Sequence, residues 1–153
     1  MKALELKVPP VFVFLLCICF MYWFHSLDTR FVVSLPFSKL VFAACFVASG
    51  YFGLSGIFEF KKAKTSVHPV DIHKTTTVVD TGVYRYSRNP MYFGLLLLLV
   101  GYGYYLQDLL SLVVCLVFVM YMNKFQIGLE ERHLKEKFGK DYTDYKNRVR
   151  RWI

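Results

Sequence analysis

The chain has 153 residues, of which 56% are hydrophobic and 18% aromatic, whereas only 20% are charged. A single domain of this length cannot bury so much apolar surface in its own core, so the composition excludes an ordinary soluble protein and predicts that a lipid bilayer solvates much of the chain. The net charge of +8 could indicate nucleic acid binding, but no base-stacking or groove-reading motif accompanies it, and basic residues in membrane proteins mark cytoplasmic loops.

The first expected membrane span covers residues 8–24. Pro9 and Pro10 suit the first turn of a helix, where amide donors are unpaired in any case, and Trp23 suits the membrane interface at the other end. The apolar run ends in bulky residues and lacks the small residues of a signal-peptide cleavage site. We therefore expect this helix to be retained.

A second span is expected at residues 37–58. It contains Gly50, Gly53 and Gly56, which could indicate a phosphate-binding loop or a close helix contact. No strand precedes these glycines and they fall in the middle of an apolar run, so close helix packing is favoured.

The third and fourth expected spans form a hairpin. After Asn89 there is no charged residue until Asp108, and after Asp108 there is none until Lys124. We expect helices near residues 91–106 and 109–127 joined by a very short turn. Both are short for a full crossing, which implies a locally thinned bilayer or a Lys124 side chain that reaches the surface.

Lysine and arginine residues are distributed unevenly along the chain. Six lie in residues 61–90 and nine lie from residue 124 onward, while the turn of the hairpin has none. The positive-inside rule places both rich segments, and both termini, in the cytoplasm. The sequence therefore predicts one all-α, polytopic membrane domain of residues 1–153: two spans in 1–60, a cytoplasmic loop in 61–90, a helical hairpin in 91–129 and a cytoplasmic helical tail in 130–153. A bacterial inner membrane is the expected location.

Two polar segments at the ends of the hairpin are candidates for chemistry. Arg88, Asn89 and Pro90 precede the third span; one interpretation is that Asn89 caps the helix, Pro90 starts it and Arg88 meets lipid phosphate. At the end of the fourth span, a spacing of three and seven residues places Asn123, Gln126 and Glu130 on one helix face.

The alternative for this second segment is a solvated helix end, with Glu130 and Glu131 paired with Arg132 and Lys135. A hairpin, however, brings both polar segments to the same membrane face. We therefore expect a shared polar pocket at the head of the hairpin, which is the usual form of a ligand site.

The order of these motifs resembles a known enzyme superfamily. Gly82-Val-Tyr84, then Ser87-Arg-Asn-Pro-Met-Tyr-Phe-Gly94, an apolar hairpin, Glu130-Glu131 and the closing Arg151-Trp-Ile153 are similar to the isoprenylcysteine carboxyl methyltransferases and phospholipid methyltransferases, especially their small bacterial members. The resemblance covers about residues 69–153. The two N-terminal spans match only in being apolar helices.

The resemblance implies S-adenosylmethionine as the cofactor and a lipophilic or lipid-modified methyl acceptor that enters from the bilayer. It also implies that residues from the loop, the third span and the paired glutamates line the cofactor pocket: Pro69, Gly82, Tyr84, Arg88, Asn89, Pro90, Tyr92, Gly94, Glu130 and Glu131. The residues expected to act in catalysis are Arg88, Asn89, Gln126 and Glu130. No metal is expected, and the four cysteines (Cys17, Cys19, Cys45 and Cys115) fall within apolar stretches.

Two departures from the superfamily pattern bear on the acceptor. Asn89 stands where many members have histidine, and an amide cannot act as a general base. Gln126 stands where prenylcysteine enzymes tend to carry an arginine that holds the substrate carboxylate. O-methylation of a carboxylate is favoured because a carboxylate needs no base. The alternatives are N-methylation of a phospholipid, a nicotinamide-dependent enzyme of the sterol-reductase type, and a non-catalytic membrane partner.

Overall fold

The computed structural model describes residues 8–27, 33–64 and 76–153, and within these ranges every regular element is a helix. Four long apolar helices are present, as the sequence predicts: α1 (Pro10–Ser26), α2 (Ser38–Lys62), α3 (Pro90–Leu106) and α4 (Leu109–Tyr121). The shorter elements are a 3₁₀ turn η3 (Gly82–Arg85), a π-helical turn η4 (Met122–Ile127), α5 (Gly128–Phe138) and α6 (Lys140–Arg148).

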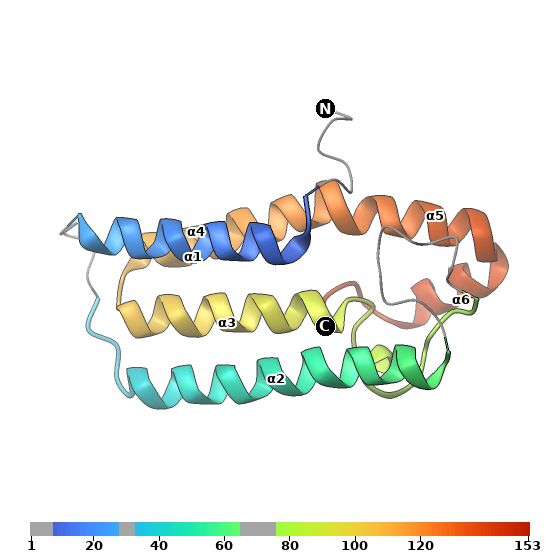
Figure 1. The fold of residues 1–153 in the computed structure, drawn as a ribbon, viewed down its shortest axis with the longest axis horizontal. Helices are drawn as coiled ribbons and strands as arrows, with labels where there is room; N and C mark the ends of the chain where they lie inside the picture. Colours follow the sequence, from blue (N-terminus) through green and yellow to red (C-terminus); the bar gives the residue numbers. More distant parts are fainter. Residues whose placement is uncertain (1–7, 28–32, 65–75) are drawn as a thin grey trace.

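Helix α3 is central in the bundle (Figure 1). It packs along α2 on one side and against α1 and α4 on the other. Helix α4 continues through η4 into α5 as one long helical run that extends past the bundle, and α6 folds back against α5. The polar ends of α3 and α4 therefore lie at the same end of the molecule.

Small residues allow α2 and α3 to approach closely. A Cβ atom on Gly101 would lie 2.6 Å from the Cβ of Cys45, and one on Gly94 would lie 3.0 Å from the carbonyl oxygen of Ser49. Of the three glycines expected to pack in α2, Gly56 faces the side chain of Met91, but Gly50 faces open space. The close contact is thus made largely by glycines of α3, which the sequence analysis did not single out for packing.

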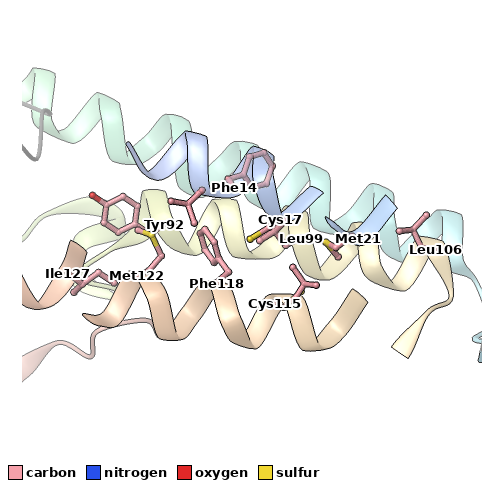
Figure 2. Packing of buried hydrophobic residues seen from close by; sticks show 12 residues of the cluster. Phe14, Cys17, Met21, Tyr92, Leu99, Leu106, Cys115, Phe118, Met122 and Ile127 are labelled. Carbon is pink, nitrogen blue, oxygen red and sulfur yellow. The ribbon is translucent and has the colours of Figure 1, made fainter. Parts of the chain in front are cut away.

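Helices α1, α3 and α4 share an apolar core (Figure 2). Met21 of α1, Leu99 of α3 and Phe118 of α4 are fully buried where the three helices meet. Cys17 and Cys115 are buried in the same cluster as small apolar side chains. This packing fixes the angle of the hairpin and hence the separation of its polar ends.

The turn of the hairpin is as short as predicted. Gln107 ends α3 in the left-handed conformation (φ 57°), and Asp108 begins α4. The Asp108 carboxylate accepts hydrogen bonds from the backbone N–H groups of Leu110 and Ser111, which are otherwise unpaired at a helix start. Two residues are therefore enough to reverse the chain.

Two helical runs are long and apolar enough to cross a bilayer: α2 and the continuous helix of residues 109–138. Only 11% of the most apolar stretch of α2 is buried within the protein, whereas the core helix of a soluble protein is mostly buried. Large side chains such as Leu40, Val47 and Leu54 project outward from it. These surfaces are those of a membrane protein. Helices α1 and α3 are apolar but shorter, with 17 residues each.

Candidate functional site

The start of α3 and the end of the α4 run converge on Glu130. The hydroxyl of Tyr92, in the first turn of α3, donates a hydrogen bond of 2.7 Å to Oε1 of Glu130. The amide nitrogen of Gln126 donates to the same oxygen at 2.5 Å and lies 3.5 Å from the Tyr92 hydroxyl. The hairpin thus brings together three of the residues that the sequence singled out.

Glu130 receives only neutral donors in the part of the chain that the structure describes. No described lysine or arginine forms an ion pair with it, although its side chain is half-buried. Burial raises the pKa of Glu130, while the hydrogen bonds from Tyr92 and Gln126 oppose this rise. A half-buried carboxylate without a described counter-charge is suited to a ligand that brings a positive charge.

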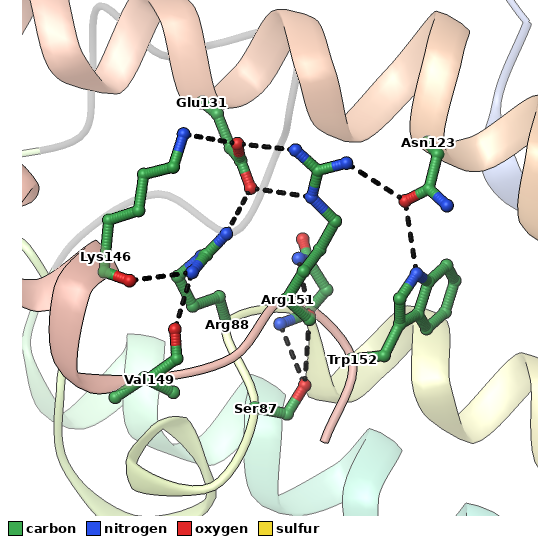
Figure 3. A network of polar contacts seen from close by, with 9 residues as sticks. Ser87, Arg88, Asn123, Glu131, Lys146, Val149, Arg151 and Trp152 are labelled. Atoms are coloured by element: carbon green, nitrogen blue, oxygen red, sulfur yellow. Dashed lines mark hydrogen bonds and ion pairs between the residues drawn. The ribbon is translucent and has the colours of Figure 1, made fainter.

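The neighbouring Glu131 has the opposite environment (Figure 3). Arg88 binds its Oε1 at 2.7 Å, Lys146 binds its Oε2 at 3.1 Å, and Arg151 forms a two-pronged pair with both oxygens at 2.9 and 2.8 Å. Burial alone would raise the pKa of this carboxyl, but the hydrogen bonds from Arg151, Arg88 and Lys146 outweigh it and hold the pKa at about 2. The two adjacent glutamates therefore differ: Glu131 is paired with three cationic side chains, whereas Glu130 has no described cationic partner.

Asn89 occupies the N-cap position of α3, as expected, but its side chain makes no capping bond. It instead donates to the backbone oxygen of Arg151 at 3.0 Å. Pro90 is the first residue of the helix, in agreement with the sequence analysis. Asn89 therefore ties the helix start to residue 151, a contact that the sequence does not suggest.

The π-helical turn at residues 122–127 separates Asn123 from Gln126. A π turn inserts an extra residue relative to an α-helix, so the face predicted from α-helical spacing is broken. Gln126 points to Glu130, whereas Asn123 accepts hydrogen bonds from Trp152 at 3.1 Å and Arg151 at 3.3 Å. The expected common face of all three polar residues was wrong for Asn123.

Gly82 and Tyr84 lie in η3, which packs against α2 and precedes the start of α3. Gly82 has a positive φ of 56°, and a Cβ atom there would clash with the Glu59 carboxylate of α2 at 2.5 Å. Tyr84 is buried, with its ring edge-on to Phe60 and its carbonyl bound by the Tyr145 hydroxyl at 2.9 Å. Burial raises the pKa of Tyr84 well above its ordinary value, so it stays protonated.

Gly94 lies further along α3, where its missing side chain makes room for the backbone of α2. Pro69 lies outside the described residues. The contacts of Ser87, Lys146, Arg151 and Trp152 were not anticipated by the sequence analysis, although Arg151 and Trp152 belong to the motif that carries the resemblance.

The donor set can be compared with the chemistry of the cofactor that the resemblance implies. S-adenosylmethionine carries a sulfonium, an ammonium and a carboxylate. Glu130 offers an unpaired negative charge, and the Nε of Arg88 is a buried donor without a hydrogen-bond partner in the described chain. One group matches a cation and the other an anion, so the residues present fit this cofactor. No cluster of metal-ligating side chains occurs among the described residues.

Fold and site together define a helical membrane protein with a cluster of polar side chains at the head of an apolar hairpin. The chain belongs to the phospholipid methyltransferase family, whose sequence profile matches residues 38–141.

Individual relatives have a similar core. An uncharacterised Haemophilus influenzae protein is 41% identical over 63 residues, which cover 41% of this chain and all of that protein. The yeast (Saccharomyces cerevisiae) protein-S-isoprenylcysteine O-methyltransferase is 40% identical over 75 residues, which cover 47% of this chain and 30% of that enzyme. Protein-S-isoprenylcysteine O-methyltransferase B of Arabidopsis thaliana is 36% identical over 72 residues, which cover 47% of this chain and 36% of that enzyme. The matched part therefore spans about a third of these methyltransferases. No solved structure matches the chain.

Proposed function

We propose that this protein is an integral membrane methyltransferase that uses S-adenosylmethionine and methylates a lipophilic acceptor, with O-methylation of a carboxylate as the favoured reaction. The observation that carries the proposal is Glu130: a half-buried carboxylate at the head of an apolar hairpin, bound among the described residues by Tyr92 and Gln126. The family and the isoprenylcysteine O-methyltransferases among its relatives support the reaction class.

In this proposal Glu130 would hold the ammonium of the cofactor, and Tyr92 would offer an aromatic ring to its sulfonium. Arg88, through its unpaired Nε, and the N-terminus of α3 at Pro90 would attract its carboxylate. Bound S-adenosylmethionine would supply an electrophilic methyl group. The remaining proposed lining comes from the loop, from α3 and its N-cap, and from α5: Pro69, Gly82, Tyr84, Asn89, Gly94 and Glu131.

The residues of the chain act by alignment and exclusion of water. Tyr92 and Gln126 fix the position of Glu130 and favour its ionised form, because each donates a hydrogen bond to its oxygen. A carboxylate acceptor is already ionised at neutral pH and needs no base, so positioning can supply most of the rate increase. The apolar surfaces of the hairpin admit an acceptor from the lipid.

A second candidate is N-methylation of a phospholipid head group, which the name of the family favours. An amine acceptor must first lose a proton. Glu130 is the carboxylate proposed to accept it, and burial raises the pKa of Glu130 above its ordinary value. The two reactions differ in the acceptor alone and share the cofactor site.

The proposed topology has four membrane-spanning helices, α1 to α4, within one domain of residues 1–153. Both termini then face the cytoplasm, as the excess of lysine and arginine in residues 61–90 and in the tail favours. A bacterial inner membrane is the proposed location.

The first experiment is calorimetry on the purified protein in detergent with S-adenosylhomocysteine and, separately, with NADPH. Binding of S-adenosylhomocysteine is expected, and binding of NADPH alone would overturn the proposal. Incubation with a lipid extract and methyl-labelled cofactor would then identify the acceptor, since an alkali-labile methyl ester and a methylated amine are readily separated.

A matched pair of variants tests the role of Glu130. Glu130→Gln removes the charge that we assign to the cofactor ammonium, so S-adenosylhomocysteine affinity should fall by roughly tenfold or more. Glu136→Gln, on the exposed side of α5, makes the same chemical change away from the site and should bind like the wild type. Equal affinities in both variants would refute the assignment.

A further inference from the structure

Residues 149–153 connect the two halves of the site, which belong to different parts of the chain. This segment follows α6 and passes between the start of α3 and the α4–α5 run (Figure 3). We refer to residues 149–153 as the strap.

On one side the strap holds residues 87–89. The backbone N–H of Arg88 donates to the carbonyl of Arg150 at 3.0 Å, and the side-chain amide of Asn89 donates to the carbonyl of Arg151 at 3.0 Å. The Arg88 guanidinium also donates to the carbonyl of Val149. Three successive carbonyls of the strap therefore fix the residues that begin α3.

On the other side the strap is bound by side chains of η4 and α5. Arg151 forms its two-pronged pair with Glu131 and donates to Asn123 at 3.3 Å, and Trp152 donates to the same Asn123 oxygen at 3.1 Å. The two-pronged geometry fixes the guanidinium plane and its backbone, which a single contact would not do.

Arg88 has its orientation set almost entirely by these partners. Its side chain is 9% exposed, and its described hydrogen bonds go to Glu131 and to the carbonyls of Lys146 and Val149. Val149 belongs to the strap, Lys146 to the helix α6 that precedes it, and Glu131 carries the carboxylate that binds the strap. Without the Arg151 side chain, Glu131 would keep ion pairs with Arg88 and Lys146 only among the described residues. The hydrogen bond from Trp152 to Asn123 would then be the remaining described side-chain hydrogen bond between the strap and the α4 run.

We propose that Arg151 is a positioning residue: through Glu131 and the strap carbonyls it holds Arg88, Asn89 and the start of α3 in the geometry that receives the ligand. This rests on the proposed function only in naming the ligand as S-adenosylmethionine. Arg151 touches neither Glu130 nor Tyr92 within the contacts of the described chain, so its effect on the ligand is indirect.

The test compares Arg151→Ala, Arg151→Lys and the control Arg150→Ala in the full-length protein. Arg150 precedes Arg151, is exposed, and contributes only its backbone carbonyl to the strap, so its replacement removes the same charge without the pair. Hydrogen–deuterium exchange is measured over residues 82–92. The same proteins are assayed for S-adenosylhomocysteine affinity, and for KM and kcat once an acceptor is in hand.

Arg151→Ala is expected to accelerate exchange in residues 82–92 and to weaken S-adenosylhomocysteine binding by roughly tenfold, with kcat nearly unchanged. Arg151→Lys, which keeps the charge but loses the two-pronged geometry, should be intermediate, and it provides the same test if the alanine variant does not fold. Arg150→Ala should behave as the wild type.

Unchanged exchange in residues 82–92 of both Arg151 variants would overturn the positioning role, as would a fall in kcat with unchanged cofactor KM. Failure of the wild type to bind S-adenosylhomocysteine would overturn the proposed function instead. Exchange that is faster in Arg151→Ala but not in Arg150→Ala would still support the strap, because that measurement needs no cofactor.

Discussion

Replacement of Glu131 by glutamine would remove the carboxylate on which Arg88, Lys146 and Arg151 converge. The pKa of this group is about 2 in the folded protein, against an ordinary value of 4.5. Each tenfold difference in proton affinity between the folded and unfolded states corresponds to about 1.4 kcal/mol. The ionised carboxylate therefore contributes about 3 kcal/mol to folding at neutral pH, and Glu131→Gln should lose this amount.

The pH dependence gives the sharper test. Because the folded-state pKa of Glu131 is lowered, its contribution is complete above pH 4.5 and decreases as the pH falls toward 2. Glutamine does not titrate, so the difference in free energy of unfolding between wild type and Glu131→Gln should shrink over this range. The assay is denaturant unfolding in detergent micelles, followed by circular dichroism at several pH values.

The control is Glu136→Gln, which alters an exposed carboxylate of the same helix and should change the free energy of unfolding by less than about 0.5 kcal/mol. A difference between wild type and Glu131→Gln that stays constant from pH 7 to pH 3 would refute the reasoning. It would mean that the ion pairs seen around Glu131 do not stabilise the folded state.

Two further predictions concern the helices that carry the site. Gly101→Ala should lower the free energy of unfolding by about 1–3 kcal/mol, because its Cβ would lie 2.6 Å from that of Cys45. Gly50→Ala meets no atom within 4 Å and should be neutral or stabilise the helix by up to about 1 kcal/mol, so equal effects of the two changes would contradict the close α2–α3 contact. Asp108→Ala removes the cap of α4 and should cost about 1–2 kcal/mol in the same unfolding assay, and an unchanged midpoint would show that the cap contributes nothing.

The helices could be predicted from the sequence because their apolar runs end at charged residues or prolines. The expected start of the third span at residue 91 differs by one residue from the observed start at Pro90, and the expected turn at Gln107 and Asp108 is the one observed. The second helix runs beyond its expected end at residue 58 to Lys62, since lysines are good helix formers and stay solvated. Hydropathy marks where a helix leaves the apolar region and not where its hydrogen bonds stop.

The meeting of Tyr92 with Glu130 and of Arg88 with Glu131 could also be predicted, because a tight hairpin fixes which ends are neighbours. The different partners of the two glutamates, neutral donors for Glu130 and cations for Glu131, could not be predicted. The difference depends on Arg151, which is distant in the sequence and reaches Glu131 only after α6 turns the chain back. Contacts of this kind have no local pattern that a reader of the sequence could recognise.

The π turn at residues 122–127 has absorbed one extra residue within a helix that is α-helical on both sides. Each residue of an α-helix advances the side-chain direction by about 100°, and the wider π turn offsets that advance for the extra residue. Deletion of one residue here would therefore permit a regular helix and leave Glu130 and Glu131 directed at Tyr92 and Arg88. A homologue that is one residue shorter in this stretch can keep its acidic pair in place, so a single gap in an alignment would mark a lost π turn and an intact site.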